Sequence, residues 1–257
     1  MDLLHAAQPY LALTLLVFLA GFVDAIAGGG GLITLPAYLA HGLNPALLLG
    51  TNKLSSSMGT AVAAARFLKE LRFRADLLFI LVTLAAGVAF LGARAIALVP
   101  PETIRYLLLV LLPPVAVFLA ARKSFGFGDT SARFTPDTLL GRGGGISFFI
   151  SFYDGLLGPG TGTFLALAFT RLCGYDLLRA TALAKLLNLV SNLAALGTFL
   201  YLGKVDLKLG LAMGLAGMAG NYAGSHVALK KGAWIIRPML FLVSAALLAK
   251  IAWDMLK

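Results

Sequence analysis

The sequence predicts an all-α fold: a polytopic membrane bundle of helices. Sixty per cent of the 257 residues are hydrophobic and only 12% are charged, about half the charged fraction of a typical soluble domain. The apolar stretches also follow one another with only brief polar interruptions. These observations exclude a soluble globular domain, a disordered chain and a disulfide scaffold, the last because Cys173 is the single cysteine.

The apolar stretches predict about eight full spans and two short half-helices, since a spanning helix needs about 20 residues. The longer runs are 9–27, 46–68, 76–98, 104–121, 143–157, 177–203, 207–229 and 237–256. Two shorter runs, 32–41 and 162–173, are too short to cross untilted. Each follows a glycine-rich break that ends the preceding helix, and the breaks are Gly28-Gly29-Gly30-Gly31 and Gly158-Pro159-Gly160-Thr161-Gly162.

The two halves of the chain repeat one another. Residues 21–30 align without a gap on residues 151–160, which places Asp24 on Asp154 and Gly28 on Gly158. A small gap then brings Lys53 onto Lys185. We interpret this as a duplication, with a first transmembrane repeat at 1–121, a polar linker at 122–142 and a second transmembrane repeat at 143–257.

The second repeat is predicted to be inverted relative to the first. Each half has five apolar pieces, and an odd number reverses the orientation of the next half. With both termini outside, most lysines and arginines fall on the cytoplasmic side, as the positive-inside rule requires. Lys69, Arg72, Arg133 and Lys230 are examples. The linker is then cytoplasmic, and the expected location is the inner membrane.

Four charged residues lie in or next to the apolar spans: Asp24, Lys53, Asp154 and Lys185. A charge near the bilayer centre is costly, so each needs a partner, water or a function. One interpretation is a pair of static ion pairs that hold the halves together. The other, which we favour, is a functional site, because an acid stands before each break and a lysine after it.

The breaks indicate that this site binds an anion. Non-helical backbone at membrane depth survives only in the protein interior or along a watery cavity. The short helices then point their N-termini, which carry free N–H groups and a positive dipole end, at that cavity. The predicted substrate-binding residues are Gly28, Gly29, Gly30, Gly31, Thr34, Asn52, Lys53, Gly158, Gly160, Thr161, Lys185, Asn188 and Asn192.

Several motifs resemble the TauE/SafE family of membrane permeases over nearly the whole chain. In the first half they are residues 21–31, Pro36 and residues 51–54; in the second half they are residues 155–160, 184–188 and 236–238. The resemblance implies transport of sulfur-containing anions such as sulfite, sulfoacetate and other organosulfonates. Pro159 and Thr161 stand where the first break has glycines, so the two half-sites are not equivalent.

We therefore predict a secondary transporter, a permease for a small anion such as sulfite or an organosulfonate, coupled to protons. Asp24 and Asp154 are the candidate proton-coupling groups, and Asp154 is favoured for its asymmetric break. The alternative is a cation or metal transporter or channel with these two acids as ligands, which Lys53 and Lys185 argue against.

No enzyme, cofactor, metal site or nucleic-acid partner is expected from this sequence. It holds only three histidines, and no phosphate-binding loop of the Gly-x-x-x-x-Gly-Lys-[Ser/Thr] type is present. The expected partners are a small anionic substrate, protons and the lipid bilayer. A homo-oligomer is compatible with the sequence.

Overall fold

The computed structural model describes residues 2–100, 103 and 128–242, and this part of the chain is helical without strands. Its elements are α1 (Asp2–Ala27), α2 (Gly31–Ala40), α3 (Pro45–Glu70), α4 (Ala75–Ala97), the 3₁₀ turn η1 (Ser131–Arg133), α6 (Pro136–Leu156), α7 (Thr161–Cys173), α8 (Leu177–Tyr201) and α9 (Leu207–Lys231). A further short apolar helix spans Ala233–Leu242. The predicted span at 104–121, and most of the one at 237–256, lie outside the described residues.

The predicted helical bundle with two short helices is confirmed. Helices α2 and α7 begin at Gly31 and Thr161, near the end of each glycine break and one residue before the runs expected from the sequence. Among the described residues, three helices are both long and apolar enough to span a membrane, in Tyr10–Ala27, Ala75–Ala97 and Leu177–Tyr201. Helices α3, α6 and α9 are also long but carry more glycine and polar residues.

Helix α6 begins earlier than its apolar run, inside the region predicted as linker. Thr135 caps the helix by accepting from the N–H of Thr138, and Pro136 occupies the first turn. Both are strong helix-start signals, because the cap satisfies a free N–H group and the proline is already fixed at a helical φ. The polar composition of this stretch therefore conceals about the first two turns of a helix, residues 136–142.

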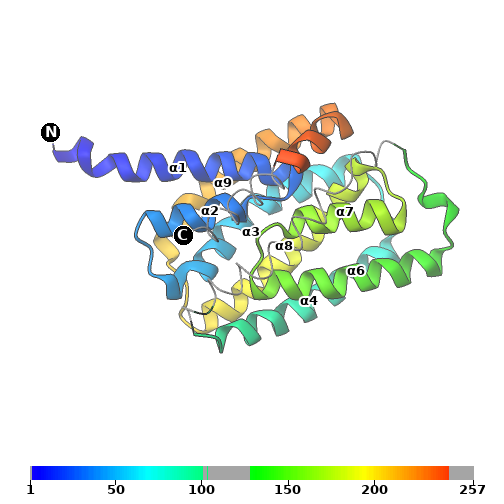
Figure 1. Cartoon of the computed structure of the whole chain (residues 1–257), viewed down its shortest axis with the longest axis horizontal. Coiled ribbons are helices and arrows are strands. Elements are labelled where there is room, and N and C mark those ends of the chain that lie inside the picture. Colours follow the sequence, from blue (N-terminus) through cyan, green and yellow to red (C-terminus); the bar gives the residue numbers. More distant parts are fainter. Residues whose placement is uncertain (1, 101–102, 104–127, 243–257) are drawn as a thin grey trace, which may run out of the picture.

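The helices pack in pairs that correspond between the two halves (Figure 1). Helix α1 packs against α9, and α6 packs against α4; α3 packs against α9, and α8 packs against α4. The short helices also correspond, because α2 contacts α1 and α3 while α7 contacts α6 and α8. Helices α3 and α8 contact each other between the two outer pairs.

Glycines allow the outer pairs to approach very closely. A Cβ atom at Gly220 of α9 would lie 2.0 Å from the carbonyl oxygen of Phe18 in α1. A Cβ atom at Gly155 of α6 would lie 2.1 Å from the carbonyl oxygen of Ala89 in α4. Small residues of this kind are common where membrane helices pack against each other.

The outward faces of the bundle are apolar, as contact with lipid requires. Large exposed hydrophobic side chains occur on most of the long helices, among them Leu15, Leu19, Phe79, Leu91, Phe149, Leu211 and Leu215. By contrast, buried polar side chains gather on α3 and α8, the two long helices that contact each other between the outer pairs. The polar interior is the place where a functional site is expected.

Candidate ion-pair site at the crossing of the helix breaks

The two glycine breaks touch each other inside the bundle. Gly28 adopts a φ of +79°, and a Cβ atom there would lie 2.3 Å from the backbone carbon of Gly162 and the nitrogen of Thr163. A positive φ together with so close a backbone approach admits only glycine. The hydroxyl of Thr163 also donates to the carbonyl oxygen of Ala27 across the contact. Residues from opposite halves therefore form one crossing point.

Each acid pairs with the lysine of the other half. Lys185 Nζ lies 2.7 Å from Asp24 Oδ2, and Lys53 Nζ lies 2.8 Å from Asp154 Oδ1. Both lysine side chains are almost completely buried. The four charges predicted from the sequence are thus brought together as two crossed ion pairs beside the two breaks.

The pair formed by Lys53 and Asp154 is fully hydrogen-bonded. The three donors of an ammonium group match the acceptors around Lys53 Nζ, which are Asp154 Oδ1, the Asp154 carbonyl oxygen at 2.6 Å and Asn192 Oδ1 at 2.8 Å. We call Lys53, Asp154, Thr161, Asn188, Ser191 and Asn192 the Asp154 site.

The carboxylate of Asp154 has partners on both oxygens. Thr161 donates to Oδ1 at 3.0 Å, Asn188 donates to Oδ2 at 2.9 Å, and the hydroxyl of Ser191 donates to the same oxygen. The side chain is only 1% exposed. A charged pair this well satisfied is held firmly, since removal of any partner leaves a buried group without its hydrogen bond.

The other pair has fewer partners, and we call Asp24, Gly30 and Lys185 the Asp24 site. Asp24 accepts from Lys185 on Oδ2 and from the N–H of Gly30 on Oδ1 at 3.1 Å. Within the described residues, Asp24 is the one acceptor found for the Lys185 ammonium. The Asp24 side chain is 16% exposed, against 1% for Asp154.

A small polar cavity of about 20 Å³ adjoins the Asp24 site. Asp24, Gly30, Thr34, Ser55 and Asn221 contribute to its wall. This volume is enough for about one water molecule. The Oδ1 atom of Asn221, a residue of this wall, is buried and has no hydrogen-bond partner within the described residues.

The other predicted residues lie around the two sites. The hydroxyl of Thr34 donates to Asn52 Oδ1. Gly158 and Gly160 both adopt positive φ angles, +89° and +79°, and so form the sharp turn that carries Thr161 to Asp154. Gly29 is buried within the first break, while Gly31 faces Pro159 of the second.

Both lysines face carboxylates, as in the ion-pair interpretation raised from the sequence, and anion binding by these residues stays a prediction. The predicted site residues also omit Ser191 of the Asp154 site, Ser55 and Asn221 of the adjoining cavity, and Tyr38. Ser191 stands three residues after Asn188 on the same helical face, a spacing that gives a usable signal. Tyr38 donates to Ser55 Oγ at 2.7 Å, a contact between separate helices that no spacing indicates.

Comparison with known proteins supports a transporter. The model of the sulfite exporter TauE/SafE family matches residues 13–251. A probable membrane transporter protein, ORF9, of Sinorhizobium sp is 40% identical over 237 residues, which cover 92% of this chain and 90% of the relative.

Two further relatives carry similar names. The probable membrane transporter protein YfcA of Escherichia coli K12 is 38% identical, covering 92% of this chain and 87% of the relative. A probable membrane transporter protein of Haemophilus influenzae is 37% identical, with 92% of each chain covered. No solved structure shows a significant match. The chain belongs to the TauE/SafE family, and it is a multi-pass membrane transporter of the permease type.

Proposed function

We propose that this permease carries a small sulfur oxyanion, sulfite or an organosulfonate, across the inner membrane in exchange with or together with protons. The observation that carries the proposal is the Asp24 site: a buried ammonium with one carboxylate acceptor, next to a break in the helix and a polar cavity. The family description, sulfite exporter, supports the class of substrate.

The substrate would compete with Asp24 for Lys185. An oxyanion beside an ionised Asp24 is repelled, whereas a protonated Asp24 is neutral and leaves the ammonium free to bind the anion. Release of the anion would return Lys185 to Asp24 and release the proton. Proton and anion movement are thereby coupled through one exchange of partners.

Asp24 is the better coupling group on structural grounds, although the asymmetric second break favoured Asp154. Asp154 receives hydrogen bonds on both oxygens and is almost fully buried, so protonating it would break several contacts at once. Asp24 has two partners and is partly exposed. The same two ion pairs argue against the cation transporter, since each acid already faces a lysine.

Uptake of labelled sulfite into proteoliposomes under an imposed pH gradient tests the function. We expect Lys185→Ala to lower uptake at least roughly tenfold, because truncating one partner of a buried charge pair removes the binding charge. Lys208→Ala is the matched control, since this lysine is exposed at the start of α9. Unchanged uptake by folded Lys185→Ala would make Lys185 structural, and flux of divalent metal without sulfite would favour the cation transporter.

The coupling role of Asp24 is tested by Asp24→Asn. The neutral amide mimics the protonated acid, so exchange of labelled sulfite across the membrane should persist while accumulation driven by the pH gradient is lost. If Asp24→Asn still accumulates sulfite with the wild-type pH dependence, Asp24 is not the coupling group.

We also propose that the halves are inverted repeats joined by a cytoplasmic linker. The crossed ion pairs and the corresponding packing partners of the two halves support the duplication. Inversion rests on the odd number of apolar pieces and the distribution of basic residues. Reporter fusions at Arg133 and after Lys257 should report opposite sides of the membrane; signals from the same side would exclude inversion.

A further inference from the structure

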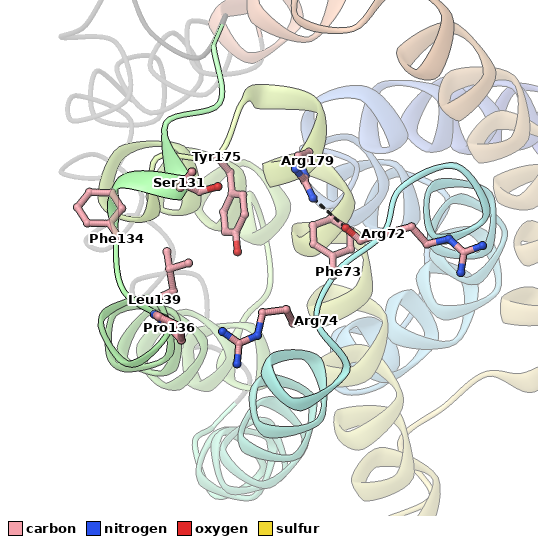
Figure 2. Close-up of a pocket in the computed structure, with 10 residues that line it drawn as sticks. Arg72, Phe73, Arg74, Ser131, Phe134, Pro136, Leu139, Tyr175 and Arg179 are labelled. Carbon is pink, nitrogen blue, oxygen red and sulfur yellow. Dashed lines mark hydrogen bonds between the residues drawn. The ribbon is translucent and has the colours of Figure 1, made fainter.

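A second, larger cavity of about 420 Å³ opens where the α3–α4 connection, η1 and the start of α8 meet (Figure 2). Phe73, Arg74, Ser131, Leu139, Tyr175 and Arg179 contribute to its wall. The Tyr175 side chain and the Arg74 guanidinium extend toward its centre in Figure 2. None of these residues belongs to the ion-pair sites described above.

The cavity wall carries two arginines that already pair with neighbouring acids. Arg74 donates to both oxygens of Asp76, at 3.1 and 2.5 Å. Arg179 pairs with Asp129 at 3.1 Å and donates to the carbonyl oxygen of Arg72 at 2.8 Å. Exposed pairs of this kind contribute little stability, so their arginines can exchange partners. The Nε atom of Arg179 is buried without a hydrogen-bond partner among the described residues, so the side of the guanidinium that can meet a ligand is its pair of terminal nitrogens.

Tyr175 adds a further donor. Burial raises the pKa of Tyr175, so its hydroxyl keeps its proton at neutral pH. Arginine forks and a phenol are groups that recognise small oxyanions, whereas the Ser131 hydroxyl already donates to Asp129 Oδ1.

An apolar cluster lies between this cavity and the Asp154 site. It includes Tyr175 together with Leu81, Ile146, Phe169, Leu183 and Leu187 from helices α4, α6, α7 and α8, and Phe73 and Leu139 pack against it. Along α8 the rise from Arg179 to Asn188 is roughly 13 Å. The cavity is therefore one short helical segment away from the crossed ion pairs, with tightly packed side chains in between.

We propose that this cavity is a peripheral oxyanion-binding site, the entrance from which a small anion such as sulfite or sulfate reaches the ion-pair sites once the apolar cluster opens. Its role as an entrance rests on the proposed transport function. Anion binding in the cavity does not, because it rests on the arginines and the tyrosine of the cavity wall.

The charge of the cavity is measured with a cysteine in place of Leu139, whose side chain lines the cavity. In a Cys173→Ser, Leu139→Cys protein, we expect an anionic methanethiosulfonate reagent to react about tenfold faster than a cationic one, because a basic cleft concentrates anions. Sulfate should slow the anionic reagent. Arg74→Gln with Arg179→Gln should abolish both effects, and Arg133→Gln, an exposed arginine outside the cavity wall, should preserve them. Equal reaction rates of the two reagents in the unsubstituted background would overturn the proposal.

Transport kinetics then test the entrance. We expect Arg74→Gln with Arg179→Gln to raise the half-saturating concentration of labelled sulfite about tenfold with little change in maximal rate, while Arg133→Gln stays at the wild-type value. Wild-type kinetics in the double variant would exclude the entrance. No sulfite flux in the wild-type protein would instead refute the transport function and the entrance, and the reagent experiment would still decide whether the cavity binds anions.

A phospholipid headgroup also presents phosphate oxygens. The lipid composition of the bilayer is therefore varied to distinguish a bound lipid from a free anion. The reagent experiment is repeated in nanodiscs of pure phosphatidylcholine and in nanodiscs containing phosphatidylglycerol. Sulfate protection in pure phosphatidylcholine supports the free anion. Protection by phosphatidylglycerol, without protection by sulfate, would assign the cavity to lipid and overturn the entrance.

Discussion

The Asp154 site and the Asp24 site are built from aligned residues but differ in how completely their charges are satisfied. Asp154 accepts from Lys53, Thr161, Asn188 and Ser191, whereas Asp24 accepts from Lys185 and the N–H of Gly30. One acid is 1% exposed and the other 16%. The difference shows that duplicated sequence does not impose duplicated chemistry: neighbouring residues decide whether an ion pair is fixed or exchangeable.

The largest expected effect is on stability. Asp154→Asn leaves the Lys53 ammonium buried without its charge partner, which costs about 3–5 kcal/mol of unfolding free energy. Asp24→Asn should cost less, roughly 1–2 kcal/mol, because Asp24 is partly exposed and lies beside a cavity large enough for a water molecule. Thermal unfolding of the detergent-solubilised proteins measures both.

A double substitution checks the cause. Lys53→Met with Asp154→Leu removes both charges of the pair and should recover much of the stability lost in Asp154→Asn. Equal losses in Asp24→Asn and Asp154→Asn would break the distinction between the two sites.

The second-largest expected effect is the loss of stability when a glycine of either break is replaced by alanine. Gly28→Ala places a methyl group against the backbone of Gly162 and forces alanine to a positive φ, at a cost of about 2–3 kcal/mol. Gly158→Ala has the same backbone strain, but its methyl group meets side-chain atoms of Asp154 and Lys53 at 2.9 and 3.0 Å, so it should cost less. Both are compared by thermal unfolding.

The matched control is Gly197→Ala. Gly197 lies within α8 with open space around its Cβ position, so alanine there should be neutral or stabilise the protein by up to about 1 kcal/mol. If Gly28→Ala were as stable as Gly197→Ala, the contact between the two breaks would not hold the halves together.

The smallest expected effect comes from giving the first break the threonine that the second break has. Gly31 aligns with Thr161, and a Cβ atom at Gly31 would meet only ordinary contacts, 3.4 Å from Pro159. Gly31→Thr should give Asp24 the hydroxyl donor that Thr161 gives Asp154. Because that bond gives the carboxylate one more partner to lose, sulfite uptake under the pH gradient should be slower than in the wild type. An unchanged rate would mean that the threonine does not explain the difference between the sites.

The residues of the ion-pair sites were readable from the sequence because charges inside apolar spans are rare. Asp24, Lys53, Asp154 and Lys185 stand out for that reason, and the ungapped alignment of 21–30 on 151–160 relates the two halves. Which acid meets which lysine was not readable, since spacing within a half does not determine contacts between halves. The structure supplies the crossed pairing.

Other features depend on backbone paths that periodicity does not describe. The contact of Gly162 with Gly28 gives no signal, because a glycine does not reveal its neighbour. The 420 Å³ cavity arises from connections between helices, in particular residues 72–74 and 131–136, whose course carries no hydrophobic pattern. The start of α6 at Pro136 was hidden by polar composition, although Thr135 and Pro136 form a recognisable cap.

The crossed pairing has a consequence for biogenesis. While the chain is being synthesised, the helices carrying Asp24 and Lys53 enter the membrane before residues 154 and 185 exist. Each of these two early charges finds its native partner only in the second half, so the first half enters the bilayer with a deficit of a few kcal/mol for each charge. Completion of α6 and α8 removes this deficit, which makes assembly of the two halves, rather than insertion of either alone, the step that commits the protein to its fold.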